Sequence, residues 1–286
     1  MQPRYDVRGA LLEAKRRLTP VDPESASLNA HILLSAALGV DRAWLLANAT
    51  DMLPPAEEHE FFNLVARAEK GEPIPYILGQ WGFYDRDFIV TPAVLIPRPE
   101  TELLLEAALA FTQPRDHAVV VDVGTGSGAL AVTLAALCPR AVVYAVDASH
   151  PALEVARRNA AAHQADVVFF EGDLLLPIQE RQMQVDMIMA NLPYIPSQLV
   201  PQLAVSRYEP HQALDGGADG LMLVRRLLEQ APALCRPGAR LLLEIAYDQG
   251  AAAVELARNA FPLAQVQLLK DFAGHDRVVE IDLPQK

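Results

Sequence analysis

Residues 121–130 read VDVGTGSGAL, an apolar strand that runs into three closely spaced glycines and then into a helix. Glycines at positions 124, 126 and 128 let the backbone turn tightly and let a ligand approach it closely. A glycine turn between a strand and a helix is typical of nucleotide and nucleoside sites.

The pattern around the turn predicts an α/β fold. Apolar segments rich in β-branched residues alternate with helical segments such as LEVARRNAAAHQ and LMLVRRLLEQAPALC. This alternation predicts a parallel sheet with helices on both faces. The last two strands have only AGHD between them and should form an antiparallel hairpin at one edge. The seven predicted strands are residues 118–124, 141–147, 167–173, 185–191, 239–246, 264–272 and 277–283.

Two acidic residues strengthen the prediction of a nucleotide or nucleoside site. Asp147 ends the second strand about 20 residues after the glycine turn, where a carboxylate can accept hydrogen bonds from ribose hydroxyls. Asp173 ends the third strand and is placed to meet an adenine amino group. The letters GTGSGA also satisfy the dinucleotide fingerprint, because Ala129 can stand for its third glycine. These residues leave both NAD and S-adenosylmethionine as possible ligands.

The start of the chain has a different character. Residues 1–75 carry apolar residues at three- and four-residue spacings, broken by prolines, and predict a small helical domain. Residues 76–96 mix aromatics with a Gly/Asp turn and predict a β-hairpin linker. Residues 97–286 hold the predicted sheet.

Composition excludes several classes of protein. The net charge is −12, and neither the helical segment nor the rest has the basic surplus of a nucleic-acid-binding protein. No apolar run approaches the roughly 20 residues that span a bilayer, and the N-terminus lacks the apolar core of a signal peptide. The two cysteines have neither metal-ligand nor disulfide spacing. We expect a cytoplasmic protein with no metal site and no membrane partner.

The fourth strand ends in MANLPYIP, residues 189–196. An Asn-x-Pro-Tyr turn beside an adenosyl site resembles the amino-methyltransferases, which use S-adenosylmethionine to methylate a nitrogen in a planar amide or amidine-like group. The Asn191 side-chain oxygen and the Leu192 carbonyl would each accept one N–H of that group and aim its lone pair at the methyl. Pro193 would stiffen the turn and Tyr194 would stack on the flat group. The same NLPY spelling also resembles the ribosomal RNA adenine dimethylases.

The order of further motifs narrows the family. The segments LIPRPETELLLE (95–106), NLPYIP, YEPHQALDGGADGLMLVRRLL (208–228), LLLEIAYDQG (241–250) and KDFAGHDRVVEI (270–281) follow one another along the chain. This succession resembles the peptide chain release factor glutamine methyltransferases, of the HemK/PrmC type, over nearly the whole chain. The resemblance implies a class I methyltransferase fold, with S-adenosylmethionine as methyl donor. The implied substrate is the side-chain amide nitrogen (N5) of the GGQ glutamine in class 1 release factors.

The resemblance also implies site residues. The implied donor contacts are Gly124, Thr125, Gly126, Ser127, Gly128, Asp147, Asp173, Leu174 and Asn191. The implied catalytic residues, which also bind the substrate glutamine, are Asn191, Leu192, Pro193 and Tyr194. The implied lining of the approach is Arg98, Pro99, Glu100 and Thr101. The residues themselves allow two plainer interpretations. The whole role of Arg98 could be to pair with Glu100 or Glu102, and LDGGADG could be a glycine turn and nothing more.

Three positions depart from the family pattern. Leu192 replaces a proline, Leu174 sits where an aromatic often flanks the adenine, and Ala246 replaces a glycine. These departures leave other functions open: methylation of another glutamine, as on a ribosomal protein, methylation of adenine in nucleic acid, or an inactive donor-binding scaffold. The acidic charge favours a protein partner over direct contact with nucleic acid. We expect a monomer in which the helical domain recruits the release factor.

Overall fold

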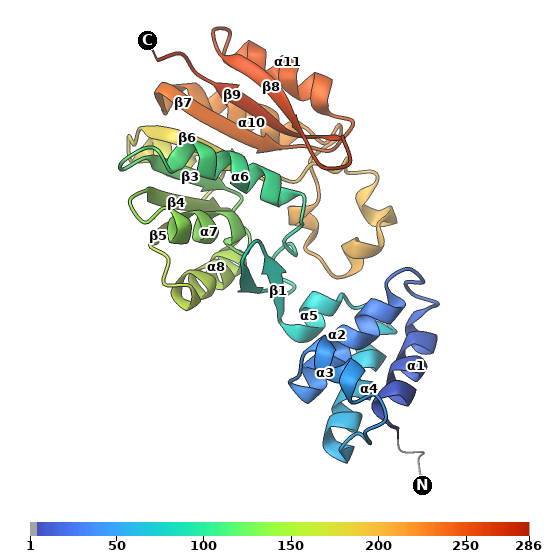
Figure 1. Cartoon of the computed structure of the whole chain (residues 1–286). Coiled ribbons are helices and arrows are strands. Elements are labelled where there is room, and N and C mark those ends of the chain that lie inside the picture. Colours follow the sequence, from blue (N-terminus) through green and yellow to red (C-terminus); the bar gives the residue numbers. More distant parts are fainter. Residues whose placement is uncertain (1–4, 286) are drawn as a thin grey trace. The chain divides into compact units, whose positions relative to one another are not determined.

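The computed structural model describes residues 5–285, so the outermost residues of the predicted first and third domains lie outside the described part. The chain divides after Gly79 into two compact units. The predicted linker hairpin is present as β1 (Gln80–Phe83) and β2 (Arg86–Ile89), and it belongs to the second unit. Figure 1 draws both units.

The first unit is helical. Its helices are α1 (Val7–Leu18), α2 (Ala26–Leu38), α3 (Arg42–Ala47), α4 (Pro55–Ala68) and α5 (Ile74–Leu78). Asp6 begins α1 by accepting a hydrogen bond from the Gly9 N–H at 2.7 Å, and Asp41 begins α3 in the same way. Leu33 and Leu34 of α2 and Phe61 of α4 are fully buried, and α2 packs against both α1 and α4, so burial of apolar side chains stabilises the unit.

The second unit contains the sheet. Its strands are β3 (Val119–Val123), β4 (Val142–Asp147), β5 (Val167–Glu171), β6 (Val185–Ala190), β7 (Cys235–Glu244), β8 (Gln265–Lys270) and β9 (Asp276–Asp282). Its α-helices are α6 (Thr101–Thr112), α7 (Ala129–Leu137), α8 (His150–Ala162), α9 (Leu176–Glu180), α10 (Met222–Gln230) and α11 (Gly250–Ala260). Short 3-10 helices are η1 (Val200–Gln202), η2 (Ala204–Arg207), η3 (His211–Ala213) and η4 (Ala231–Ala233).

The sheet has the order β5-β4-β3-β6-β7-β9-β8 within the described residues, as Figure 1 shows. Strands β3 to β7 pair in parallel, whereas β9 pairs antiparallel with both β7 and β8. The predicted seven-stranded Rossmann-like sheet and its C-terminal hairpin are therefore confirmed. The main difference from the predicted ranges is at β7, which starts at Cys235 rather than at residue 239.

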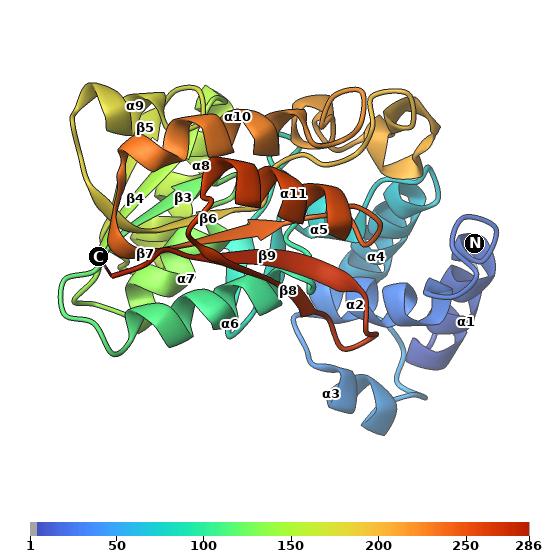
Figure 2. The same ribbon diagram turned by 90° about the horizontal axis from the view of Figure 1, so that it is seen from above.

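The two faces of the sheet have separate apolar cores. Alternate residues point to opposite sides, so Val121 packs with α10 and α11 whereas Val120 packs with α6 and α7. Figure 2 shows α10 and α11 on one side of the sheet and α6 and α7 on the other. Both faces are thus covered, and the edge where the parallel strands end is left for a ligand.

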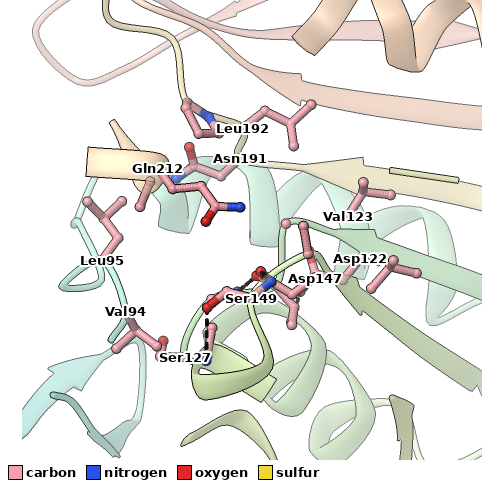
Figure 3. Close-up of a pocket in the computed structure, with 18 of the residues that line it drawn as sticks. Val94, Leu95, Asp122, Val123, Ser127, Asp147, Ser149, Asn191, Leu192 and Gln212 are labelled. Atoms are coloured by element: carbon pink, nitrogen blue, oxygen red, sulfur yellow. Dashed lines mark hydrogen bonds between the residues drawn. The ribbon is translucent and has the colours of Figure 1, made fainter. Parts of the chain in front are cut away.

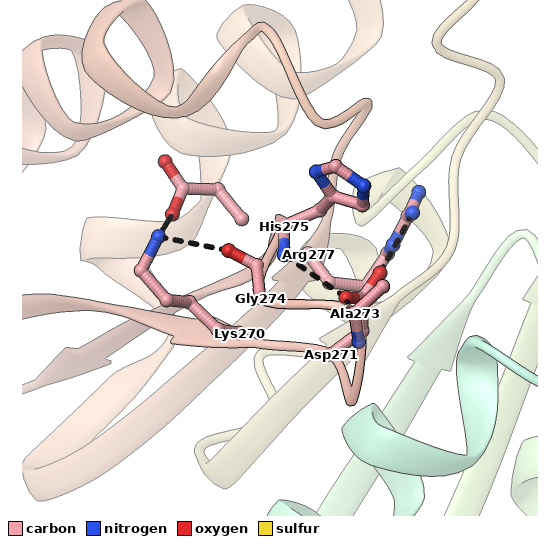
Figure 4. A network of polar contacts seen from close by, with 7 residues as sticks. Lys270, Asp271, Ala273, Gly274, His275 and Arg277 are labelled. Carbon is pink, nitrogen blue, oxygen red and sulfur yellow. Dashed lines mark hydrogen bonds and ion pairs between the residues drawn. The ribbon is translucent and has the colours of Figure 1, made fainter.

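The turn between β8 and β9 is held by polar contacts (Figure 4). Asp271 accepts hydrogen bonds from the Ala273 and His275 N–H groups, both at 3.0 Å, and pairs with Arg277. Lys270 reaches across the turn to Asp276 at 2.7 Å. The family-like segment KDFAGHDR therefore shapes a hairpin turn. In the part of the chain that the structure describes, no helix is both long and apolar enough to cross a membrane.

Candidate active site

A cavity of about 440 Å³ opens where β3, β4 and β6 end (Figure 3). Strands β3 and β6 are neighbours in the sheet although the chain visits β4 and β5 between them, which is the switch point where open α/β sheets bind ligands. Figure 3 shows the side chains of Asp147, Ser149, Asn191 and Gln212 around this cavity. Its volume is that of a small-molecule site.

The glycine turn forms the floor of the cavity. The N–H groups of Gly124 and Thr125 both donate to the Val146 carbonyl, at 2.8 and 3.1 Å, which joins the turn to β4. Gly126 has a φ of 55°, and an added Cβ there would meet only the Gly124 carbonyl at 4.0 Å, so it would project into open space. Gly128 has a packing role instead, because a Cβ would lie 3.2 Å from Ala156.

Asp147 fixes the turn from the end of β4. Its two carboxylate oxygens accept hydrogen bonds from the backbone N–H groups of Gly126 and Ser149, each at 2.8 Å. Burial raises the pKa of Asp147, while these backbone donors lower it. Each oxygen keeps a further lone pair, so the carboxylate can hold the turn and also accept from ligand hydroxyls.

Asp122 is a lining residue that the sequence analysis missed. Its Oδ2 accepts the Thr125 hydroxyl at 2.6 Å and the Ala131 N–H at 3.3 Å, which ties the turn to α7. Burial raises the pKa of Asp122 to about 7, against the effect of these two donors. Its Oδ1 is buried without a partner in the described part of the chain. The available signal was a charged residue inside the apolar strand VVVDV.

Asp173 and Leu174, which follow β5, also line the cavity. The Asp173 carboxylate pairs with Arg226 of α10, a lining residue that the sequence analysis did not single out. Leu174 is buried with a φ of 50°, a conformation that is costly for a side chain of this kind. A ligand amino group at Asp173 would therefore share the carboxylate with Arg226.

The Asn-Leu-Pro-Tyr turn forms the opposite wall. Asn191 donates through Nδ2 to the Thr101 hydroxyl at 2.9 Å, and its Oδ1 receives no hydrogen bond among residues 5–285. The Leu192 carbonyl likewise receives none within that range. The Leu192 side chain is 4% exposed and packs on the glycine turn, since a Cβ on Gly124 would lie 3.0 Å from Leu192 Cδ2. The turn thus presents two unused acceptors.

Tyr194 anchors this turn. Its carbonyl accepts Gln249 Nε2 at 2.9 Å, and Gln249 Oε1 accepts the Ala246 N–H at 3.0 Å. Burial, then the charge of Glu244, raises the pKa of Tyr194 to about 12. The segment LDGGADG packs against the same turn, because a Cβ on Gly220 would lie 2.2 Å from the Tyr194 carbonyl oxygen. This segment therefore uses its glycines to approach the site, and its Asp215 lines the cavity.

Arg98 pairs with neither of the glutamates named in the plainer interpretation. Its guanidinium donates to Glu209 at 2.5 Å, and the Glu209 side chain is 1% exposed. Glu102 instead accepts the Tyr84 N–H at 2.9 Å. The pair joins the segment before α6 to the loop after β6, across 111 residues of sequence. Arg98 therefore holds that loop beside the cavity.

Two family models match the chain: the PrmC N-terminal domain over residues 9–79 and the Methyltransferase small domain over residues 99–207. A release factor glutamine methyltransferase of Moorella thermoacetica is 44% identical over 274 residues, 95% of this chain and 96% of the relative. One from Geobacter sulfurreducens is 42% identical over 278 residues, 96% of each chain. The chain belongs to the release factor glutamine methyltransferase family. The resemblance predicted from its motifs is confirmed.

A solved structure extends the comparison to the fold. The T. thermophilus 16S rRNA N2 G1207 methyltransferase, in complex with AdoMet and guanosine, has a TM-score of 0.50 and 19% identity. The match covers 71% of this methyltransferase and 49% of that chain. At this identity the likeness concerns the fold alone.

The cavity brings together most of the site residues predicted for this methyltransferase. Those that line it are Arg98, Thr101, Gly124, Thr125, Gly126, Ser127, Asp147, Asp173, Leu174, Asn191, Leu192 and Pro193. In the described part of the chain, Pro99, Glu100, Gly128 and Tyr194 do not line it. Among the residues that the prediction did not include are Asp122, Ser149, Gln212, Asp215 and Arg226 in the lining, with Gln249, Glu209 and Glu244 behind it.

Proposed function

We propose that this methyltransferase transfers a methyl group from S-adenosylmethionine to N5 of the glutamine in the GGQ motif of class 1 release factors. The observation that carries the proposal is the pair of unused acceptors, Asn191 Oδ1 and the Leu192 carbonyl, at the wall of the cavity. A primary amide has two N–H donors, so two acceptors are the complement that it needs.

The lining suits the methyl donor. The backbone of Gly124 and Gly126 would face it without a side chain between, Asp147 would accept its ribose hydroxyls, and Asp173 and Leu174 would lie at its adenine. The open space above Gly126, which a Cβ would fill, is consistent with this use. When bound, S-adenosylmethionine supplies an electrophilic methyl group on a sulfonium centre.

The acceptor side works by orientation. The nitrogen of an amide is a weak nucleophile because its lone pair is delocalised into the carbonyl. Asn191 and Leu192 would hold both N–H groups and turn the nitrogen toward the donor end of the cavity, and positioning of this kind can supply much of a rate enhancement. Pro193 would keep the Leu192 carbonyl in place, and Tyr194 would secure the turn through Gln249. No tightly held base is required, since the nitrogen loses its proton readily once methylated.

The first unit would recognise the body of the release factor, while the cavity of the second unit receives the GGQ loop. The enzyme would act as a monomer. The family model for residues 9–79 supports a dedicated domain there. The net charge of −12 supports a protein substrate and disfavours direct binding to nucleic acid.

The test uses purified protein, labelled S-adenosylmethionine and a class 1 release factor. A copy of the factor with alanine in place of the GGQ glutamine and an Asn191→Ala enzyme serve as controls. Label should appear on the intact factor only and be lost in both controls. If the enzyme binds the donor but labels neither factor, the assignment is wrong, and another glutamine becomes the substrate to seek.

A further inference from the structure

The primary amide that the proposed function brings to the cavity has three hydrogen-bonding parts. Its two N–H groups donate, and its carbonyl oxygen accepts. Asn191 Oδ1 and the Leu192 carbonyl complement the N–H groups, but neither of them can serve the carbonyl oxygen. A polar group that leaves water without a new partner costs about 1–3 kcal/mol, so a site that encloses this amide also needs a hydrogen-bond donor.

Most side-chain donors in the lining are already held by other residues of the chain. These pairs, named donor first, are Asn191 with Thr101, Thr125 with Asp122, Arg98 with Glu209 and Arg226 with Asp173. Ser127 and Ser149 belong to the glycine turn and to the segment after β4, on the side proposed for the methyl donor. Asp215 also lines the cavity, but a carboxylate only accepts. The carboxamide of Gln212 remains.

Gln212 is the central residue of η3, and its side chain is exposed. Figure 3 shows its carboxamide projecting into the cavity, of which Gln212 is a lining residue. Among residues 5–285 this carboxamide has no hydrogen-bond partner. No contact fixes its direction, so it can turn its nitrogen toward a ligand and donate.

The backbone of η3 is attached to the turn that carries the two acceptors. The Ile195 N–H donates to the Leu214 carbonyl at 3.1 Å, and the Gly216 N–H donates to the Ile195 carbonyl at 2.8 Å. On the other side of η3, the buried side chain of Glu209 is held by Arg98. The short helix is therefore fixed at both ends, and its cavity-facing side chain is carried by the same framework as the acceptors.

We propose that Gln212 is a substrate-recognition residue, which donates through Nε2 to the carbonyl oxygen of the substrate glutamine's side-chain amide. Together with Asn191 Oδ1 and the Leu192 carbonyl, it complements all three parts of that amide. A glutamate carboxylate has no N–H groups and would satisfy only one of the three, so the set selects glutamine. The inference rests on the proposed function, because it names a group that recognises the substrate of that reaction.

Two variants test whether Gln212 acts as a donor. Gln212→Met keeps an unbranched side chain of similar length without the N–H groups, and it should lower kcat/KM for the release factor about 2–10-fold, the effect of one lost hydrogen bond. Gln212→Glu keeps the shape, but at neutral pH it can only accept and sets a carboxylate against the substrate carbonyl. It should therefore lower kcat/KM further, by at least about tenfold.

The pH dependence of Gln212→Glu separates a donor from a residue that only packs. A protonated carboxyl has an O–H donor, and glutamate protonates with a pKa of about 4.3. The kcat/KM of this variant, divided by that of the unmodified enzyme at the same pH, should therefore rise at least about twofold between pH of about 7 and about 5. Gln212→Met should show no such rise.

Three controls accompany these measurements. Gln198 is exposed in the same loop and lies outside the lining, so Gln198→Glu adds the same charge and should keep kcat/KM within about twofold. Calorimetric titration should give Gln212→Met an affinity for S-adenosylmethionine within about twofold of the unmodified enzyme, since the lost bond belongs to the other substrate. Urea unfolding checks that every variant is folded.

The outcomes separate this inference from the proposed function. An unmodified enzyme that leaves the release factor unlabelled overturns the function, and the inference falls with it. If the unmodified enzyme labels the factor, equal kcat/KM in both Gln212 variants and the unmodified enzyme overturns the inference alone. A Gln212→Glu deficit that stays the same at low pH also overturns it, because the residue would then not act as a donor. An affinity for S-adenosylmethionine that falls as far as kcat/KM in Gln212→Met would assign the residue to the methyl donor instead.

Discussion

Gly220 offers a sharp test of how the glycine-rich segment supports the site. Its φ is +76°, and an added Cβ would lie 2.2 Å from the Tyr194 carbonyl oxygen and 2.4 Å from Gln249 Nε2. Gly220→Ala therefore combines two costs. One is the left-handed backbone, which an L side chain adopts unwillingly, and the other is a collision with the hydrogen bond that anchors Tyr194.

The two costs can be separated with a matched control. The left-handed conformation costs about 1–2 kcal/mol for an alanine, and overpacking adds about 1–3 kcal/mol. Gly274, in the β8–β9 turn of Figure 4, has a φ of +84° and no atom within 4 Å of an added Cβ. Gly274→Ala should therefore carry the backbone cost alone.

Calorimetric unfolding and methyl-transfer kinetics measure both effects. Gly220→Ala should lose about 1–3 kcal/mol more than Gly274→Ala, with about 2–4 °C of melting temperature for each kcal/mol. Its kcat should also fall, because the displaced Tyr194 carbonyl carries the turn that holds Asn191. Equal losses of stability in the two variants, with equal kcat, would refute the argument that Gly220 is required by this contact.

Three further predictions concern the walls of the cavity. Leu192→Pro should retain kcat within about tenfold, because the carbonyl remains, but lose about 1–3 kcal/mol of unfolding free energy with the buried side chain; unchanged stability in urea would contradict the packing described here. Asp147→Asn should weaken binding of S-adenosylmethionine at least about tenfold in calorimetric titration, because the Gly126 and Ser149 N–H groups donate to different carboxylate oxygens and the amide replaces one of these with a donor NH2; an unchanged affinity would count against this role of Asp147. The pKa of Asp122 is about 7 in the folded protein, above the value of about 4 expected in the unfolded chain. This difference contributes up to about 4 kcal/mol to the free energy of unfolding below a pH of about 4, and the contribution is lost as the pH rises to about 7. Urea unfolding at several pH values should show that Asp122→Asn no longer has this loss of stability between a pH of about 4 and about 7. An unchanged loss in the variant would assign it to other groups.

The fold could be predicted because its signals are local. Each strand is a short apolar run, and the spacing of glycines at 124, 126 and 128 belongs to one turn. The predicted ends of the strands were less accurate. The first residues of β7 pair with β6 across an irregularity that no sequence pattern marks. That the residues proposed to hold the donor line one cavity followed from the same rule, since strand ends meet at one edge of a parallel sheet.

The partners of the site residues could not be predicted in the same way. Thr101 and Asn191 are 90 residues apart, and the contact between Arg98 and Glu209 spans 111. Such pairs depend on how helices and loops return to the sheet, which periodicity does not record. Glu244 looked like one polar residue in LLLEIA, and only the packing of α6 on β7 shows that it lies behind the active site.

The contact between Leu192 and Gly124 has a thermodynamic consequence. A side chain next to Asn191 rests on the backbone of the glycine turn, and closely packed atoms of this kind cannot shift independently. With the methyl donor on the turn and the substrate glutamine at Asn191, as proposed, any adjustment that the donor imposes on the turn would change the free energy of binding at Asn191, and reciprocity would require the same factor in the other direction. Donor and release factor would then bind cooperatively, so the affinity measured for either would depend on the concentration of the other.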